Sequence, residues 1–320
     1  MSYRIERYLS LPEMNQDDYL LQKSDLEKRD LFMEILHNGI HGLCFSIYGN
    51  GQKPGDTISE DQVRRRLEII RPHTSWVRSF SCTEGNEHIP KIANELGLKT
   101  MVGAWLGKDA EANNREIEGL IRLAKEGLVD IAAVGNEVLY RKDLTEEELM
   151  NFIHHVKSEL PGIPVGYVDA YYEFTQRPAI TEACDVILAN CYPFWESCSA
   201  EKSLAYMKQM YAQTKKAAGN KPVIISETGW PSQGEELEGA VPSEINALNY
   251  FLNTQLWCMD EGVDCFYFSS FDESWKKTLE GELGAYWGIW DKEEKLKFQV
   301  INSEINQINN SDINLKINNV

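Results

Sequence analysis

Two acidic residues each follow a short apolar run, and this placement makes them candidates for acid/base and nucleophilic chemistry. The run Ile131–Gly135 leads through Asn136 into Glu137, and the run Val223–Ser226 leads into Glu227. A carboxylate at the end of a buried strand is costly unless it has a partner or a purpose. Paired carboxylates cleave glycosidic bonds when one protonates the leaving oxygen and the other attacks the anomeric carbon or activates water. The pattern indicates a pair of this kind.

Aromatic residues gather near the same strand ends. Trp230 follows Glu227 in a Gly-Trp-Pro turn, Tyr192 and Trp195 follow the sixth apolar run, and Trp105 ends the third. Such rings offer apolar faces on which sugar rings stack. A cleft walled by aromatic side chains and floored by carboxylates favours an uncharged polysaccharide as the ligand.

The elements that must position these residues follow an alternating pattern. Eight β-rich runs are separated by helical stretches, and their continuous apolar character is typical of parallel strands buried on both faces. The predicted strands are Gly42–Tyr48, Ser75–Phe80, Lys99–Trp105, Asp130–Asn136, Val165–Asp169, Asp185–Tyr192, Pro222–Glu227 and Asp264–Phe271. The pattern favours an α/β fold, a single (β/α)₈ TIM barrel whose functional residues lie at the carboxyl ends of the strands. A doubly wound open sheet is the alternative, but the chain has no Gly-rich nucleotide-binding turn.

The helices are predicted from apolar spacing and capping signals. Ser24 with Glu27, and Thr145 with Glu148, each have the spacing of a capping box. The predicted barrel helices include Asp61–Ile70, Glu111–Glu126, Glu146–Glu159, Ser203–Ala218 and Ser243–Glu261.

We expect three parts along the chain. Residues 1–39 form an N-terminal helical extension that packs on the barrel and ends at Gly39. Residues 40–300 form the catalytic barrel. Residues 301–320 are rich in Asn and Ile with little pattern, and we expect a partly disordered tail.

Composition excludes several classes of partner. The 320 residues carry 32 basic and 50 acidic side chains, a formal charge of −18 that argues against nucleic acid and anionic membrane surfaces. We expect no membrane segment, no metal site and no cofactor. The seven cysteines form no C-x-x-C pair and several lie in apolar runs, so we interpret them as reduced core thiols. With no signal-peptide pattern at the N-terminus, we expect a cytoplasmic protein; the oligomeric state is left open.

Three segments carry a more specific signal. They are Gly135–Val138, Ser226–Ser232, and Phe271–Lys276 with the following Glu282 and Trp287-Gly288. In this order they resemble the signature segments of glycoside hydrolase family 17, and the resemblance covers roughly residues 41–300. His73–Trp76 and Gly103–Asp109 are also similar to stretches of bacterial members.

The resemblance implies a retaining enzyme that acts on β-1,3-linked or mixed-linkage glucan, with Glu137 as acid/base and Glu227 as nucleophile. It also implies a set of substrate-side residues. These are Asn136 at the sugar 2-hydroxyl, Tyr192 near the nucleophile, Tyr48 at the first strand, and Glu273, Lys276 and Glu282 in a polar network around the site.

Three functions remain open from the sequence. The first is hydrolysis of β-1,3-glucan or its oligosaccharides, and the second is glucanosyl transfer through the same glycosyl-enzyme. The third is a carbohydrate-binding protein without activity, although such a protein would be expected to have lost one of the two glutamates. For catalysis we expect a raised pKa at Glu137, Lys276 close to the carboxylates, and a carboxyl separation of about 5–5.5 Å.

Overall fold

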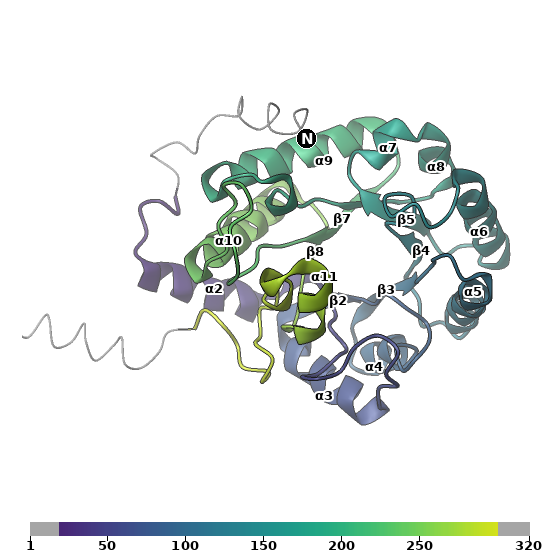
Figure 1. Ribbon diagram of the computed structural model, residues 1–320, viewed down its shortest axis with the longest axis horizontal. Helices are drawn as coiled ribbons and strands as arrows, with labels where there is room; N and C mark the ends of the chain where they lie inside the picture. Colours follow the sequence, from purple (N-terminus) through teal and green to yellow (C-terminus); the bar gives the residue numbers. More distant parts are fainter. Residues whose placement is uncertain (1–18, 300–320) are drawn as a thin grey trace, which may run out of the picture.

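The chain folds into a closed barrel of eight parallel strands, seen along its opening in Figure 1. The computed structural model describes residues 19–299, so the expectations for residues 1–18 and for the tail 301–320 lie outside the described residues. The strands are β1 Ile40–Cys44, β2 Thr74–Arg78, β3 Lys99–Ala104, β4 Ile131–Asn136, β5 Val165–Ala170, β6 Ile187–Asn190, β7 Val223–Thr228 and β8 Cys265–Tyr267. Each strand pairs with the next, and β8 pairs with β1, where Gly42 lies opposite Phe266. The predicted TIM barrel is confirmed, and the open sheet is excluded.

Helices surround the barrel, as Figure 1 shows. They are α2 Asp25–Asn38, α3 Glu60–Ile70, α4 His88–Glu95, α5 Ala110–Lys125, α6 Glu146–Glu159, α7 Glu173–Gln176, α8 Pro178–Ala183, α9 Ser203–Ala218, α10 Glu244–Glu261 and α11 Lys277–Glu280. The two predicted capping boxes are present. The side chains of Ser24 and Thr145 accept from the backbone N–H groups of Glu27 and Glu148, and the side chains of these glutamates accept from the backbone N–H groups of Ser24 and Thr145. Each such cap satisfies backbone donors that a helix start leaves unpaired.

The helix α2 precedes the barrel and lies beside α10 (Figure 1). The ring of Phe32 meets that of Phe251 edge-on at 5.0 Å, and Arg29 forms an ion pair of 2.7 Å with Glu244. The helix ends at Gly39, whose φ of 83° suits a residue without a side chain.

Several strands are shorter than the sequence predicts, and β1 and β8 end earliest relative to the prediction. β1 ends at Cys44 rather than Tyr48, and β8 ends at Tyr267 rather than Phe271. After β8 the backbone leaves the barrel ladder, because the N–H of Ser269 donates to the carbonyl of Trp287 in a later segment. Apolar residues continue beyond both strands because the segments that follow are also buried, so composition did not mark these ends.

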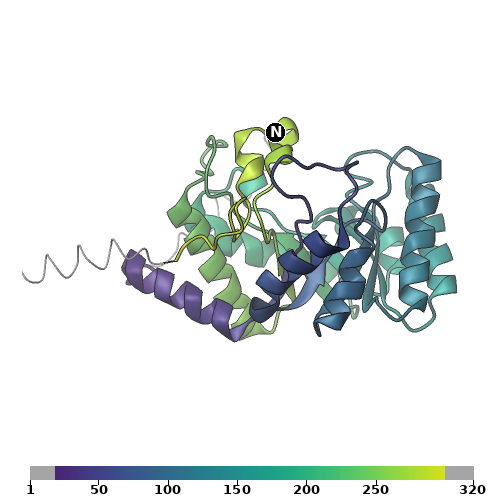
Figure 2. The ribbon, with the colours of Figure 1, turned by 90° about the horizontal axis from the view of Figure 1, so that it is seen from below.

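Loops of unequal length rise above one end of the barrel. Figure 2 shows α11 and the segment after β1 standing on the same side, while α2 lies toward the opposite side. This end is the carboxyl end of the strands, where barrels of this type place their functional residues.

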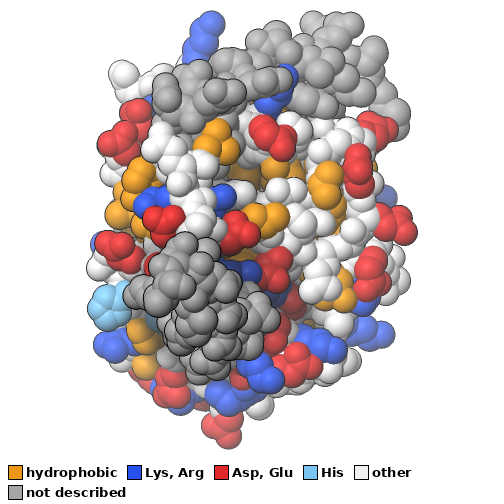
Figure 3. Space-filling view, turned by 90° about the vertical axis from the view of Figure 1, so that its left-hand side faces the viewer, with side chains coloured by type: hydrophobic (Ala, Val, Ile, Leu, Met, Phe, Trp, Pro, Cys, Tyr) orange, Lys and Arg blue, Asp and Glu red, His pale blue; other side chains and the backbone are white. Residues whose placement is uncertain are grey.

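Charged side chains lie on the surface and the thiols lie in the interior. Figure 3 shows acidic and basic side chains interspersed with separate hydrophobic patches on the face that it presents. All seven cysteines are free and buried, which confirms their interpretation as core thiols. Within residues 19–299, no helix combines the length and the apolarity that crossing a bilayer requires.

Candidate active site

Three strands end in polar residues that converge on one point. Glu137 follows β4, Asn190 ends β6, and Glu227 lies one residue before the end of β7. The ladder shifts register near each of these ends: between Ala133 and Asn136 in β4, between Ala189 and Asn190 where β6 pairs with β7, and again where β7 pairs with β8. Such irregularities bend a strand and re-aim its side chains, and they recur beside active sites.

The amide of Asn190 joins the two carboxylates. Its Nδ2 donates to Oε1 of Glu137 at 2.9 Å and lies 3.2 Å from Oε1 of Glu227. The two Oε1 atoms are therefore separated by at most the sum of 2.9 and 3.2 Å, about 6.1 Å. The two glutamates, distant in sequence, share one small space at the mouth of the barrel.

Glu227 is surrounded by donors. Nη1 of the buried Arg78 lies 2.6 Å from Oε1 of Glu227, and the hydroxyl of Tyr192 donates to Oε2 at 2.8 Å. Burial alone would lower the pKa of Arg78, but the charge of Glu227 and its hydrogen bond, together with Cys44 and Tyr192, raise the pKa overall. This ion pair, with the two neutral donors, stabilises a negative charge on a carboxylate that is only 6% exposed.

Glu137 lies in a different electrostatic environment. Burial, and then the negative charge of Glu227, raise the pKa of Glu137 to about 7, although the hydrogen bond from Asn190 opposes the shift. Like charges at short range cannot both ionise freely, so the first proton resides on Glu137, which has a neutral donor in Asn190 but no ion pair like that of Glu227 with Arg78. Glu137 therefore holds a proton near neutral pH, as the sequence analysis expected.

A cavity of about 520 Å³ opens over the two glutamates. Its walls include the aromatic side chains of Tyr140, Tyr171, Tyr172, Tyr192, Trp195, Phe268 and Trp287. The ring of Trp287 packs against Trp195 and Tyr192, with centroids 5.5 and 5.6 Å apart. An aromatic cavity with a few convergent polar groups is typical of a site for a neutral, ring-shaped ligand.

Several predicted residues form a layer next to the carboxylates. Oδ1 of Asn136 accepts from Nη2 of Arg78 at 2.7 Å. Lys276 forms an ion pair of 3.0 Å with Glu273 and lies 3.9 Å above the ring of Phe268, which lines the cavity. Burial alone would lower the pKa of Lys276, but the charges of Glu273 and Glu280 raise it, with a smaller contribution from Glu227.

Two predicted aromatic residues lie outside the cavity lining. Tyr48 packs edge-on against Trp275, with ring centroids 5.9 Å apart. Trp105 lies at the rim, 43% exposed, with its ring over the guanidinium of Arg141 at 4.6 Å. Arg141 does line the cavity, so Trp105 is one side chain removed from it.

The expectation that Trp230 presents its indole to a sugar is wrong in this structure. Trp230 is 1% exposed, and its Nε1 donates to the backbone oxygen of Val241 at 3.0 Å. Its ring packs between Phe194 and Tyr250. The Gly-Trp-Pro turn directs the indole into the protein, where its N–H is already satisfied.

The placement of Glu282 in the polar network is also wrong. Its side chain is 53% exposed and pairs with Lys277, away from the glutamates. Glu280, two residues earlier, lines the cavity instead and accepts from Nε1 of Trp287 at 3.2 Å. The short helix α11 ends at Glu280, and Gly281 follows with a φ of 76°. The chain therefore turns between Glu280 and Glu282.

Sequence reasoning missed Arg78, Asn190 and Glu280. Arg78 had a usable signal, because it follows Trp76 and Val77 within a predicted buried strand, where an arginine needs a buried partner. Asn190 lay within a predicted strand and gave no sign of its role. Among residues 19–299, no group of three or more His, Cys, Asp or Glu side chains is arranged to hold a metal ion.

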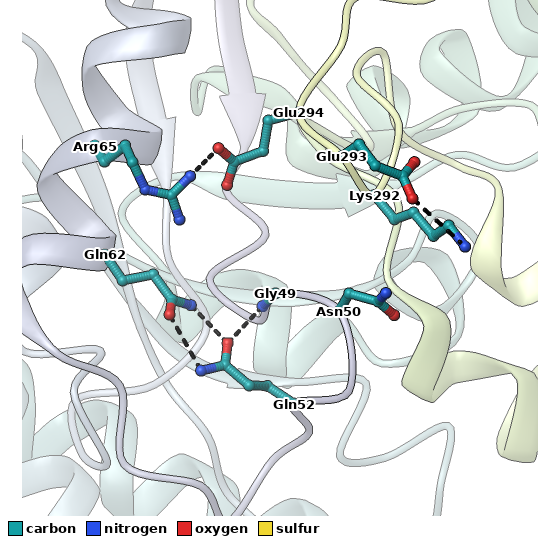
Figure 4. Close-up of a pocket in the computed structure, with 8 residues that line it drawn as sticks. All are labelled: Gly49, Asn50, Gln52, Gln62, Arg65, Lys292, Glu293 and Glu294. Carbon is teal, nitrogen blue, oxygen red and sulfur yellow. Dashed lines mark hydrogen bonds and ion pairs between the residues drawn. The ribbon is translucent and has the colours of Figure 1, made fainter.

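A second hollow of about 450 Å³ shares no residue with the cavity over the glutamates. It lies between the segment after β1 and the segment near Glu294, as Figure 4 shows. Its polar groups already bond to one another: Gln52 accepts from the backbone of Gly49, and Arg65 pairs with Glu294. These groups therefore already have partners within the protein.

The burial of Trp230 leads to a stability prediction. Trp230→Ala should lower the free energy of unfolding by about 3–5 kcal/mol, the usual cost of removing a buried indole from a packed core. Urea unfolding measures this loss. The matched substitution Trp195→Ala, at a residue 37% exposed, should cost clearly less. Unchanged stability of Trp230→Ala, with weakened oligosaccharide binding, would restore the sugar-stacking role.

The chain matches a known domain family and is similar to several characterised proteins. Residues 42–288 match the BtgE/BtgC glycoside hydrolase domain. The chain is 26% identical over 261 residues to a glucan 1,3-beta-glucosidase of Candida albicans, covering 73% of this chain and 84% of that protein. It is 25% identical over 288 residues to a glucan 1,3-beta-glucosidase of Saccharomyces cerevisiae, covering 82% of this chain and 92% of that protein.

A solved structure shows the same architecture. The glycoside hydrolase family 17 β-1,3-glucanosyltransferase of Rhizomucor miehei superposes with a TM-score of 0.74 at 26% identity, covering 82% of this chain and 98% of that one. An active-site mutant of the Rhizomucor miehei β-1,3-glucanosyltransferase has been solved with laminaritriose bound.

Proposed function

The chain belongs to glycoside hydrolase family 17, through its BtgE/BtgC glycoside hydrolase domain, and from this premise we propose that it cleaves β-1,3-glucosidic bonds with retention of configuration. In this proposal Glu227 is the nucleophile and Glu137 the acid/base. The observation that carries it is the amide of Asn190, which holds both carboxylates around one nitrogen at 2.9 and 3.2 Å. The substrate follows the named activities of the relatives, which are glucan 1,3-beta-glucosidases and a β-1,3-glucanosyltransferase.

The surroundings of the two carboxyls support different roles. The proton held by Glu137 near neutral pH is available to the glycosidic oxygen as the bond breaks. Glu227, facing the charge of Arg78, supplies the lone pair that attacks the anomeric carbon. The hydrogen bond from Tyr192 directs one carboxylate oxygen while the other contacts Arg78.

The reaction then has two displacements. In the first, the bond between Glu227 and the anomeric carbon forms, the glycosidic bond breaks, and the proton of Glu137 moves to the leaving oxygen. In the second, Glu137 accepts a proton from water, the water oxygen attacks the anomeric carbon, and Glu227 departs. Each displacement inverts the anomeric centre, so the product retains the starting configuration.

The separation of the carboxylates supports retention. Inverting enzymes keep the two groups about 6.5–9.5 Å apart to admit a water molecule. The bound of about 6.1 Å on the Oε1–Oε1 distance, from contacts of 2.9 and 3.2 Å, limits the closest approach of the two carboxyl groups to less than that range. A direct attack by Glu227 fits this spacing better than attack by an interposed water.

Glucanosyl transfer is a second candidate, favoured by the aromatic cavity walls. Tyr140 and Trp195 line the cavity and are 51% and 37% exposed, so their rings are available to a second sugar. A sugar hydroxyl bound there would replace water in the second displacement. The relative from Rhizomucor miehei whose structure has been solved is named as a glucanosyltransferase.

One incubation tests the function and separates these candidates. Linear β-1,3-gluco-oligosaccharides would be mixed with the protein, and product lengths and anomeric configuration followed in time. Shorter β-configured products indicate retaining hydrolysis, and products longer than the substrate indicate transfer. Initial release of the α-anomer, or binding with no turnover at all, would reject the proposal.

The pH dependence of kcat/KM follows from the acid. Glu137 must carry its proton in the free enzyme, and it loses that proton as pH rises through its pKa of about 7. Activity should therefore fall on the alkaline side with an apparent pKa near that value. A rate profile measured on laminari-oligosaccharide checks this, and a flat profile through neutral pH would contradict it.

A further inference from the structure

The loop that carries Glu137 has a backbone that few residues adopt unaided. Glu137 has a φ of 51°, and Gly135 has a φ of 81°. A residue other than glycine is disfavoured in this left-handed region and stays there only where surrounding contacts hold it. One such contact is the hydrogen bond from the N–H of Glu137 to the carbonyl of Val168 at 2.8 Å.

Arg141 supplies further contacts of this kind. Its backbone N–H donates to the carbonyl of Glu137 at 2.8 Å. In its guanidinium, Nη1 donates to the carbonyl of Asn136, and Nη2 donates to the carbonyl of Leu106 at 2.9 Å. A single residue thus binds the carbonyls of Asn136 and Glu137 and ties them to the neighbouring loop after β3.

The guanidinium is itself held in place. Nε donates to Asp143 at 2.7 Å, and the ring of Trp105 covers the guanidinium at 4.6 Å. A planar group with donors in a fixed fork can bond to several acceptors and stack on an aromatic ring at once, which the ammonium of lysine cannot do.

Arg141 also places a charge beside the carboxyl of Glu137. Burial raises the pKa of Glu137 most, followed by Glu227 on β7, and Asp169 on β5 adds to the shift. The hydrogen bond from Asn190 on β6 and the positive charge of Arg141 lower it. The phenol of Tyr192, after β6, faces both glutamates as a neutral group.

We infer that Arg141 is a positioning residue for the acid/base step, because it fixes the backbone around Glu137 and holds a permanent positive charge beside that carboxyl. The inference rests on the proposed function, which gives Glu137 the acid/base role. Arg141 does not exchange a proton or bond to the reacting atoms; it acts through Glu137.

Two substitutions separate the geometric and electrostatic contributions. Arg141→Met removes both the positive charge and the guanidinium hydrogen bonds. Arg141→Lys keeps the charge but loses the forked set of donors that bonds to several acceptors at once. On laminari-oligosaccharide, kcat/KM should fall by about 10- to 100-fold in both, the range expected when an acid/base group is misplaced. In Arg141→Met the alkaline limb of the profile of kcat/KM against pH should also move up by about half to one pH unit, because the loss of a neighbouring positive charge raises the pKa of Glu137. In Arg141→Lys the limb should stay in place.

The leaving group gives the sharper readout. A 2,4-dinitrophenyl β-laminaribioside releases a phenolate that needs no protonation, so its kcat/KM should change by less than about threefold in both variants if Arg141 acts through the acid. Arg64→Met is the matched control, because Arg64 lies on the outer helix α3, where it pairs with Glu60 of the same helix and with Glu95 at the end of α4. That control should match the wild type on both substrates.

The outcomes distinguish this inference from the function beneath it. Equal losses on both substrates with an unmoved alkaline limb in Arg141→Met, or wild-type behaviour in both variants, would overturn the role of Arg141 and leave the proposed function standing. Should Arg141→Met fail to fold, the ratio of the two substrates in Arg141→Lys decides. A wild-type protein that cleaves neither substrate would reject the proposed function and this inference together.

Discussion

Glu227→Gln is expected to lower kcat on laminari-oligosaccharide by about four to six orders of magnitude, the loss typical of removing a nucleophile that acts within a coupled site. A glutamine at this position keeps the volume and one acceptor oxygen beside Arg78, but it cannot form the ester to the anomeric carbon. Initial rates from reducing-end release measure the effect.

Two controls make this result specific. Glu282→Gln is the same chemical change at a residue 53% exposed and paired with Lys277, so it should keep activity within about twofold of the wild type. Urea unfolding of Glu227→Gln should show a folded protein, because the amide oxygen still accepts from Arg78 and the amide NH₂ can donate to the hydroxyl oxygen of Tyr192. Turnover near the wild-type rate in Glu227→Gln would remove the nucleophile assignment.

The second large effect is expected at Glu137. Glu137→Gln should reduce kcat/KM on laminari-oligosaccharide by about 10²- to 10⁴-fold, the contribution of a positioned acid to departure of a sugar hydroxyl. On the dinitrophenyl substrate the loss in kcat/KM should be small, since that leaving group needs no proton. The second displacement would still be slow without a base, so the glycosyl-enzyme should accumulate as a burst.

A small nucleophile provides the test of role for this variant. Azide needs no base, so it should restore turnover of the dinitrophenyl substrate and yield a β-glycosyl azide, the product of a retained configuration. An α-glycosyl azide would instead place Glu137 as the nucleophile and reverse the two assignments. Glu282→Gln again serves as the control and should show no response to azide.

Local patterns predict the barrel and its two glutamates well. Each strand that ends in a catalytic candidate is a short apolar run, such as Val223–Ser226, and the order of such runs fixes the topology of a parallel barrel. Glu137 and Glu227 were found because a carboxylate at the end of a buried run is costly, and this cost is a property of the residue and its immediate neighbours.

The polar contacts between strands were beyond such reasoning. Asn190 bridges the two carboxylates where the ladder shifts register at the ends of β4, β6 and β7. Those shifts depend on pairing between strands and leave no mark within one run. Arg78 belongs to the same group, although its charge inside β2 could have been noticed.

The errors at Trp230 and Glu282 have a different cause. Both lie in segments whose resemblance to the family is strong, but a motif fixes neither the direction of a side chain nor the register of a loop. Trp230 turns inward because Phe194 and Tyr250 form a site for its ring. Glu280 takes the place at the cavity expected of Glu282, because α11 ends between the two residues.

Covalent capture of the intermediate tests most directly whether Glu227 forms a bond to the sugar. A 2-deoxy-2-fluoro β-laminaribioside with a dinitrophenyl leaving group would slow both displacements while allowing the first, and mass spectrometry of the digested protein would locate the adduct. We predict one fluoro-laminaribiosyl group per chain, on the peptide containing Glu227, and none in Glu227→Gln. An adduct on any other residue, or none in a wild-type protein that turns over laminari-oligosaccharide, would contradict the proposed mechanism.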